Sequence, residues 1–179
     1  NKHTPEATAV SVVKKWVDAD NQDGTRTSSV QVQLYADGVA TGDPVTLNAA
    51  NSWKYQWTGL KAKNNGAAVA YTVKEVNTPA GYTAEVSGDQ TSGYTLTNKH
   101  TPEVTAVCVA KKWVDADNQD GTRPDSVQVQ LYADGQAQGD PVTLNAANSW
   151  KYQWTGLAKN KAGKAIAYTV KEVSEAKGY

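Results

Sequence analysis

The residues from Val10 to Trp16 alternate in a way that predicts a β-strand with one polar residue on its buried face. Because successive side chains of a strand point to opposite faces, Lys14 lies on the same side as three apolar residues, Val10, Val12 and Trp16. A lone ammonium on such a face must reach solvent, find a partner or lose its proton, since burial lowers a lysine pKa. Lys14 therefore needs a chemical explanation.

Two further predicted strands show the same pattern with other polar groups. In residues 71–75 (YTVKE), Glu75 shares a face with the tyrosine and the valine. In residues 94–98 (YTLTN), Asn98 shares a face with the tyrosine and the leucine. The alternation thus predicts an amine, an acid and an amide among inward-facing apolar side chains.

The whole hydrophobic pattern repeats along the chain. Residues 98–103 (NKHTPE) have the same sequence as residues 1–6. The two copies are therefore offset by 97 residues, and this offset holds without insertion or deletion to Tyr179. Across residues 14–60 the second copy differs at only four positions. Similarity this high indicates a recent duplication and a function that depends on an array of copies.

The repeat predicts two tandem domains, residues 1–100 and residues 101–179. The second copy stops at Tyr179, the counterpart of Tyr82. We therefore expect it to be truncated, without its last strands and without a counterpart of Asn98.

Strand-favouring residues and frequent turn signals place the chain in the all-β class. Val, Thr, Tyr and Trp dominate the periodic segments, and Met and Phe are absent. Seven short strands with turns between them predict a β-sandwich for each complete copy. In the first copy they are expected near residues 8–17, 28–36, 44–48, 52–58, 69–77, 82–87 and 93–99.

Charge and cysteine content exclude several function classes. The chain has 18 basic and 18 acidic residues, so no basic surface predicts binding to nucleic acid or to an anionic membrane. No apolar run approaches the roughly 18 residues of a membrane span, and no signal peptide is recognisable at the start. The single cysteine, Cys108, cannot form a disulfide within the chain.

Several separated motifs stand out in the first copy, and all but the last recur at the same spacing in the second: KKW at 14–16, DNQDG at 20–24, VQVQL at 30–34, WTGL at 57–60, YTVKE at 71–75 and TNK at 97–99. In this order and spacing they resemble the B-type repeat domains of the staphylococcal collagen adhesin (Cna B-type), which occur in Gram-positive surface adhesins.

The resemblance implies an inverse immunoglobulin-like (prealbumin-like) sandwich locked by a spontaneous Lys–Asn isopeptide bond that an acid promotes. Carried over by motif, the bond joins Lys14 to Asn98 and the catalytic acid is Glu75. In the second copy Lys111 and Glu172 match, but the partner asparagine is absent.

This chemistry accounts for the three residue types. A neutral Lys14 amine is the nucleophile, and an apolar surrounding favours that form. A buried, protonated Glu75 can polarise the Asn98 carbonyl and pass a proton to the departing ammonia. Each domain reacts once, so we expect maturation without enzymatic turnover. Residue alternation alone leaves an alternative open, in which Lys14 and Glu75 form a partly buried ion pair and Asn98 only ends a strand.

Other candidate sites are weak. Residues 18–24 (DADNQDG) resemble a calcium loop, but aligning Gly24 with the loop glycine puts Ala19 at the first ligand position, so we expect a solvated turn. His3 and His100 lack partners at metal-ligand spacing and are expected at the surface. We predict no metal site and no cofactor.

The aromatic and thiol side chains also have ordinary explanations. Trp53, Tyr55 and Trp57 share a strand face and are expected to pack in the core, although such a row could also bind carbohydrate. Cys108 is expected to point outward, with no base nearby to activate it.

The resemblance implies a structural function. We expect stalk repeats, partnered by neighbouring repeats of the same chain, that project a ligand-binding region elsewhere in an extracellular, cell wall-anchored bacterial adhesin. The alternative is that the repeats themselves bind a host extracellular-matrix or glycan ligand. Near-identical copies suit both, because a spacer needs length and a multivalent binder needs avidity.

Overall fold

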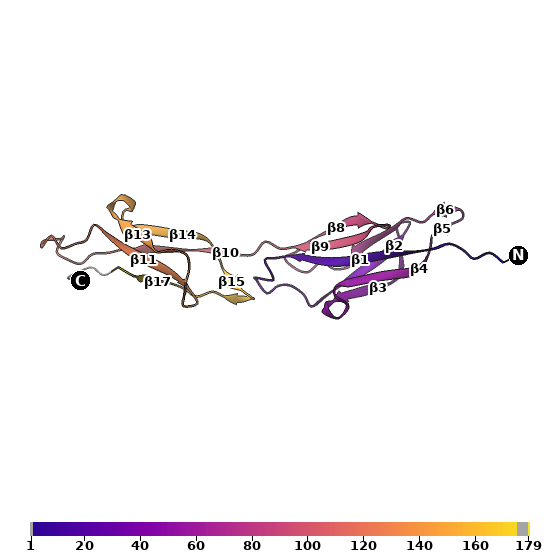
Figure 1. Ribbon diagram of the computed structural model, residues 1–179, viewed down its shortest axis with the longest axis horizontal. Coiled ribbons are helices and arrows are strands. Elements are labelled where there is room, and N and C mark those ends of the chain that lie inside the picture. The colour runs from indigo at the N-terminus through magenta and orange to yellow at the C-terminus, as the bar shows by residue number, and fades with distance from the viewer. Residues whose placement is uncertain (1, 175–178) are drawn as a thin grey trace. The chain divides into compact units, whose positions relative to one another are not determined.

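The computed structural model describes residues 2–174 and 179 and divides the chain into two compact units (Figure 1). One unit ends at Thr101 and the other begins at Pro102. This boundary lies one residue beyond the one expected from the repeat. Among the described residues, the regular secondary structure of each unit is β-strand apart from one 3₁₀ turn, as the sequence predicts.

The first unit is a sandwich of a four-stranded sheet, in the order β4-β1-β9-β8, and a three-stranded sheet, in the order β3-β2-β7. The short strands β5 and β6 form a separate hairpin. The strands are β1 (Ala7–Val17), β2 (Ser29–Ala36), β3 (Val39–Asn48), β4 (Lys54–Lys61), β5 (Lys63–Asn64), β6 (Ala67–Ala68), β7 (Tyr71–Glu75), β8 (Thr83–Asp89) and β9 (Gly93–Lys99).

The first and last strands of this unit are neighbours. β1 pairs with β4 in antiparallel orientation and with β9 in parallel, so that Trp16 lies opposite Asn98 in the register. β7 belongs to the other sheet, where Glu75 pairs with Val32 of β2. Lys14 and Asn98 therefore lie in one sheet, and Glu75 lies in the facing sheet.

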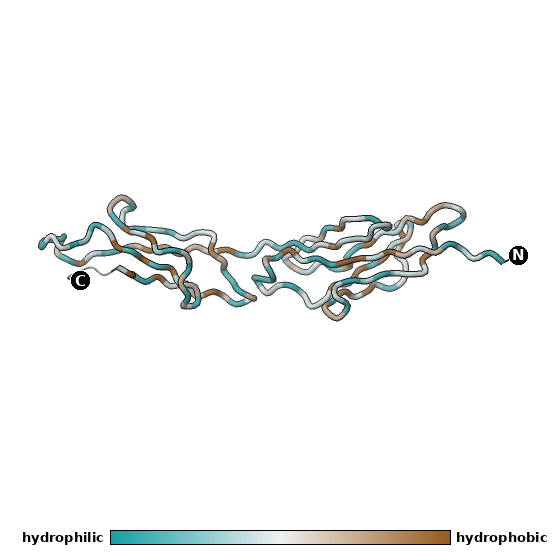
Figure 2. Tube along the Cα trace, viewed as in Figure 1, coloured by the Kyte–Doolittle hydropathy of each residue, from teal (hydrophilic) through white to brown (hydrophobic). Residues whose placement is uncertain are grey.

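The alternation of each strand builds the core between the two sheets. Figure 2 shows hydrophobic and hydrophilic residues interchanging along the strands. The inward residues lose nearly all contact with solvent, and burial of each large aliphatic side chain stabilises the fold by about 1.5 to 3 kcal/mol. The buried cluster consists of Val10, Val12, Val30, Val32, Leu34, Leu47, Val69, Tyr71, Val73 and Leu96.

Two local features differ from the predicted strands. β3 begins at Val39, five residues before the predicted start, because the tight turn at Asp37 and Gly38 lets pairing with β2 resume at once. The β5–β6 hairpin was not predicted. Its turn residues Asn65 and Gly66 both have positive φ (48° and 86°), which is the geometry that an Asn-Gly pair favours.

The second unit repeats this plan with fewer strands. Its β10 pairs with β14, while β11 pairs with β12, β13 and β17. The sequence contains no counterparts of β8 and β9, and the inward residues Val107 and Val109 of β10 are correspondingly only half-buried. The strands are β10 (Val104–Ala110), β11 (Ser126–Ala133), β12 (Gln136–Ala137), β13 (Val142–Asn145), β14 (Lys151–Ala158), β15 (Asn160–Lys161), β16 (Lys164–Ala165) and β17 (Tyr168–Glu172).

A single 3₁₀ turn follows β3 in the first unit, at Ala49–Asn51, and β13 in the second unit, at Ala146–Asn148. Asn48 and Asn145 cap these turns through their side chains, which satisfies backbone N–H groups that the short helix leaves free. Among the described residues, no helix is long and apolar enough to cross a membrane.

Candidate functional site

Lys14 lies where the alternation predicts, on the inner face of β1. The residue is 5% exposed and its side chain is fully buried. Its Nζ lies 3.9 Å from Oε1 of Glu75 and donates only a long hydrogen bond, 3.5 Å, to the carbonyl oxygen of Lys15. Burial lowers the Lys14 pKa to about 8, although the Glu75 and Asp18 carboxylates act in the opposite direction. An amine in this state is far closer to neutrality than a surface lysine.

Glu75 faces Lys14 from the other sheet and Asn98 lies on the neighbouring strand of the same sheet, so the structure brings all three predicted residues together. Nδ2 of Asn98 donates a hydrogen bond of 3.0 Å to Oε1 of Glu75. Asn98 is fully buried and the Glu75 side chain is 1% exposed. The carboxyl oxygen nearest the amine is therefore also the one that binds the amide.

Three buried polar atoms at this site have no hydrogen-bond partner. They are Oε2 of Glu75, Oδ1 of Asn98 and the indole Nε1 of Trp16. Most buried polar groups in folded proteins are paired, because an unmet hydrogen bond costs about 1 to 3 kcal/mol. The equivalent indole Nε1 of Trp113 is also unpaired in the second unit, so the feature particular to this site is the pair of unpaired oxygens on Glu75 and Asn98.

The second unit holds the equivalent lysine and acid in a different arrangement. Nζ of Lys111 donates to Oε2 of Glu172 at 2.7 Å, a direct ion pair. The two side chains are 21% and 31% exposed. Among the residues that the structure describes, no asparagine side chain binds this carboxylate, and water reaches both charges.

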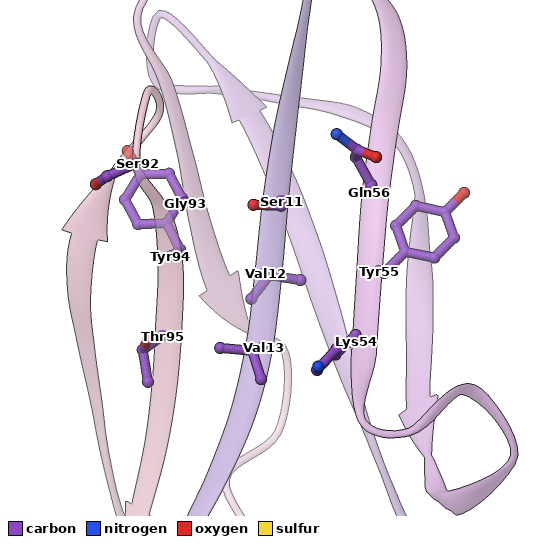
Figure 3. Close-up of a pocket in the computed structure, with 10 residues that line it drawn as sticks. All are labelled: Ser11, Val12, Val13, Lys54, Tyr55, Gln56, Ser92, Gly93, Tyr94 and Thr95. Carbon is purple, nitrogen blue, oxygen red and sulfur yellow. The ribbon is translucent and has the colours of Figure 1, made fainter.

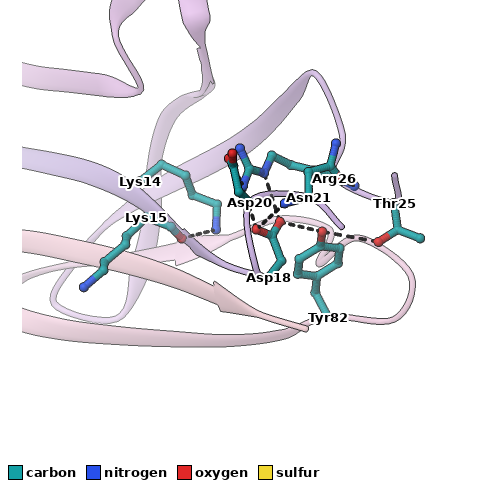
Figure 4. A network of polar contacts seen from close by, with 8 residues as sticks. All are labelled: Lys14, Lys15, Asp18, Asp20, Asn21, Thr25, Arg26 and Tyr82. Atoms are coloured by element: carbon teal, nitrogen blue, oxygen red, sulfur yellow. Dashed lines mark hydrogen bonds and ion pairs between the residues drawn. The ribbon is translucent and has the colours of Figure 1, made fainter. Parts of the chain in front are cut away.

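The loop that follows β1 was expected to be a solvated turn. This prediction was wrong for Asp18, the first residue of the loop. Asp18 is 2% exposed. It accepts two hydrogen bonds from Arg26, at 2.9 and 2.6 Å, and one from the Tyr82 hydroxyl at 2.8 Å (Figure 4). The Arg26 guanidinium holds the pKa of the Asp18 carboxyl down at about 2. Only the outer part of the loop, such as Asp20, is fully solvated.

His100 was expected at the surface, and this prediction was also wrong. Its Nε2 lies 2.8 Å from Oδ2 of Asp23 and its Nδ1 lies 2.8 Å from the carbonyl oxygen of Gly81. The side chains of His100 and Asp23 are only 14% and 5% exposed. The Asp23 carboxylate and the Gly81 carbonyl raise the His100 pKa, because both favour the imidazolium. His3, by contrast, is exposed.

The aromatic row that begins at Trp53, just before β4, and continues along that strand is partly in the core. Trp53 and Trp57 pack against the buried cluster, as predicted. Tyr55 is 40% exposed, contrary to the prediction, because β4 is an edge strand whose inner face is only partly covered. Its ring meets Trp57 edge-on, with centroids 5.1 Å apart.

A shallow pocket lies across β4, β1 and β9 (Figure 3). Ser11 and Val13, whose side chains have the parity opposite to Lys14, help to line it, and Lys14, Glu75 and Asn98 do not. A Cβ at Gly93 would lie 2.5 Å from Oγ of Ser11, so glycine allows the two strands to pair closely there. In the second unit the counterpart of Ser11 is the exposed Cys108. Within residues 2–174 and 179, no group of three or more His, Cys, Asp or Glu side chains is arranged to hold a metal ion.

The sequence matches the family described as "Cna protein B-type domain" twice, over residues 10–99 and residues 107–179. The chain belongs to the Cna B-type domain family. Both matched segments contain the lysine and the acid described above, and the first also contains Asn98.

Known B-type repeats agree in sequence and in fold. The chain is 44% identical to a collagen adhesin of Staphylococcus aureus over 96% of its own length and 14% of that protein. The crystal structure of two B repeat units (B1B2) of the S. aureus collagen binding protein matches with a TM-score of 0.89 and 43% identity, covering 94% of this chain and 45% of the other. The two units are therefore tandem B-type repeats, here called repeat one and repeat two, and they span a small part of the relative's length.

Sequence reasoning found the three central residues but missed their surroundings. Asp18 and Tyr82 lie 64 residues apart, and Asp23 and His100 lie 77 apart, so no local pattern joins them. The sequence held one signal for the first pair, since both residues recur in the second copy as Asp115 and Tyr179. The contacts recur as well: Tyr179 donates a hydrogen bond to Asp115, and Arg123 donates two to the same carboxylate.

Proposed function

We propose that these repeats form part of the stalk of an extracellular, cell wall-anchored adhesin and that repeat one is locked by an amide bond between Lys14 and Asn98. The observation that carries this proposal is the meeting of a buried amine, a buried carboxyl and a buried carboxamide from three strands. The family membership and the tandem arrangement support the stalk role.

The reaction needs only groups that repeat one supplies. The neutral Lys14 amine attacks Cγ of Asn98, a carbon–nitrogen bond forms, and the bond from Cγ to Nδ2 breaks. Nζ gives up one proton and the leaving nitrogen accepts one, with Glu75 as the carrier, so the net change is the release of one ammonia. At neutral pH about one Lys14 in ten is unprotonated when its pKa is near 8. An ordinary lysine would be neutral in only a few molecules in ten thousand.

Glu75 is the group that moves protons in this proposal. A carboxylic acid has one donor, which a carboxylate lacks. If Oε2 of Glu75 carries a proton, this unpaired oxygen becomes a hydrogen-bond donor. The unpaired Oδ1 of Asn98 is a candidate acceptor for that hydrogen bond. Such a bond draws electrons from Cγ and stabilises the negative charge that develops on the oxygen during attack.

Repeat two of this chain has the amine and the acid without the amide. Lys111 and Glu172 are therefore proposed to remain an ion pair in this chain, with no covalent product in repeat two. The difference makes repeat two an internal reference for repeat one.

Tryptic digestion followed by tandem mass spectrometry tests the bond. The proposal expects a branched peptide that joins the Lys14 segment to the Asn98 segment, absent from an Asn98→Ala chain. Recovery of both segments only as separate linear peptides would contradict it.

The stalk role has its own test. Immobilised collagen, fibronectin and glycans are exposed to the two-repeat chain, with a chain of randomised sequence order as the control. A spacer is expected to show no saturable binding. Saturable binding to one of these ligands would instead support the alternative, in which the repeats bind host ligands directly.

A further inference from the structure

The Lys14 amine has the same aromatic contact in both repeats. Nζ of Lys14 lies 4.3 Å from the ring centroid of Trp16, and Nζ of Lys111 lies 4.3 Å from that of Trp113. The contact with the acid, however, differs between the repeats, from 3.9 Å in repeat one to 2.7 Å in repeat two. The indole contact is therefore independent of β9, whereas the distance to the acid is not.

The indole ring is held by residues outside β9. Trp53 and Tyr82 meet Trp16 edge-on, with ring centroids 5.5 and 5.1 Å away. Arg26 lies 5.7 Å from the ring, and both Arg26 and Tyr82 are fixed by the buried Asp18 (Figure 4). Repeat two reproduces the set with nearly the same spacings, at Trp150, Tyr179 and Arg123.

We propose that Trp16 is a positioning residue that seats the Lys14 amine before β9 docks and holds it for attack on Asn98. This inference rests on the proposed amide bond. Once β9 has paired with β1, the Asn98 amide donates a hydrogen bond of 3.0 Å to Oε1 of Glu75. The Lys14 amine then lies 3.9 Å from that oxygen, and the side chains of Lys14 and Glu75 are buried. Repeat two shows the arrangement without β9, in which the lysine still binds the acid directly.

The ring suits this role because it can hold the amine in either protonation state. An ammonium is attracted to the face of an indole. A neutral amine can still point an N–H at the same face. A carboxylate, in contrast, stabilises the charged form and would hold the lysine unreactive. The indole thus keeps the nucleophile in place after Glu75 has been taken by Asn98.

The test follows the cross-linking of the full 179-residue chain with time. Chains are made in a short cell-free translation pulse and transferred to buffer. Samples are quenched in denaturant at intervals, and the loss of one ammonia is measured by mass spectrometry. Trp16→Leu removes the aromatic face and Trp16→Phe keeps one. Trp57→Leu is the matched control, because it removes an indole that packs against the same buried cluster and meets the ring of Tyr55.

We expect Trp16→Leu to react roughly ten- to a hundredfold more slowly than wild type, because misplacement of a reacting group by about 1 Å costs rates of this order. Trp16→Phe and Trp57→Leu should stay within about threefold of wild type. The deficit of Trp16→Leu should persist at about pH 9, where most of the Lys14 amine is neutral. If Trp16→Leu does not fold, Trp16→Met, which also lacks a ring, replaces it in the same comparison.

Three results would overturn the inference while leaving the bond itself intact: equal rates for Trp16→Leu and Trp57→Leu, no rescue by phenylalanine, or a deficit that vanishes at high pH and so reflects protonation alone. A wild-type chain that loses no ammonia would overturn the proposed function instead.

Discussion

Asn98 donates a hydrogen bond of 3.0 Å to Glu75 across the two sheets of repeat one, at the carboxyl oxygen that also lies nearest to the Lys14 amine. One acid thereby contacts both reactants. In an ion pair that served stability alone, the lysine would be expected to hold the carboxylate more closely, as Lys111 holds Glu172 at 2.7 Å. The relationship between Asn98 and Glu75 underlies the predictions that follow.

The rate of amide formation should rise with pH. The Lys14 pKa is lowered to about 8 by burial, so the neutral fraction grows about tenfold per pH unit below that value and levels off above it. Pulse-synthesised chains transferred to buffers between about pH 6 and pH 9 would show this profile as the rate of ammonia loss. A rate that is flat over this range would mean that deprotonation of Lys14 does not limit the reaction.

Loss of the bond should destabilise repeat one strongly. The link from residue 14 to residue 98 closes a loop across 84 residues, and by analogy with a disulfide it would stabilise the domain by roughly 4 to 5 kcal/mol. For residues 1–101, Asn98→Ala should lower the thermal midpoint by roughly 15 to 30 °C. Thr95→Ala, on the same strand, is the control. Equal midpoints for the two variants would rule out a stabilising cross-link.

The contact between His100 and Asp23 should make repeat one less stable as pH rises. Two acceptors flank the ring, so only the imidazolium donates to both. The His100 pKa is raised above its ordinary value of 6.5 by these acceptors. Its contribution is therefore fully present below that ordinary value and is lost as pH rises through the raised one.

Nuclear magnetic resonance titration of the His100 ring in residues 1–101 checks this directly. Asp23→Asn should move the His100 pKa down towards the ordinary value and reduce the loss of stability between about pH 6 and pH 9. Asp20→Asn is the control, since Asp20 is fully exposed in the same loop. An unchanged His100 titration in Asp23→Asn would show that the carboxylate does not set it.

The mechanical prediction follows from the pairing of β1 with β9. Tension on the ends of repeat one enters near Lys14 and leaves near Asn98, so an amide between them carries it and the residues between them stay folded. Stretching of single wild-type molecules should show no full unfolding step for repeat one. Asn98→Ala should restore a step of roughly 270 to 300 Å, the extended length of residues 15–97. A step of that length in the wild type would contradict the claim that the amide carries the tension.

Local alternation was enough to predict the centre of the site. The inward parity of Lys14, Glu75 and Asn98 depends only on each strand being extended, and all three are buried as predicted. The environment of each strand could not be predicted in this way. Tyr55 has inward parity but is exposed, because β4 lies at a sheet edge. His100 lacks any local partner and is held by Asp23, which the fold brings from 77 residues away.

The intact mass of the purified 179-residue chain tests the central claim most directly. The account predicts a mass lower than the sequence mass by one ammonia, with no second loss, because Lys111 has no asparagine partner in its own repeat. Glu75→Gln, which keeps the size of the side chain and removes its acid, should return the full sequence mass, whereas Glu172→Gln should leave the single loss in place. A wild-type chain at its full sequence mass would contradict the account.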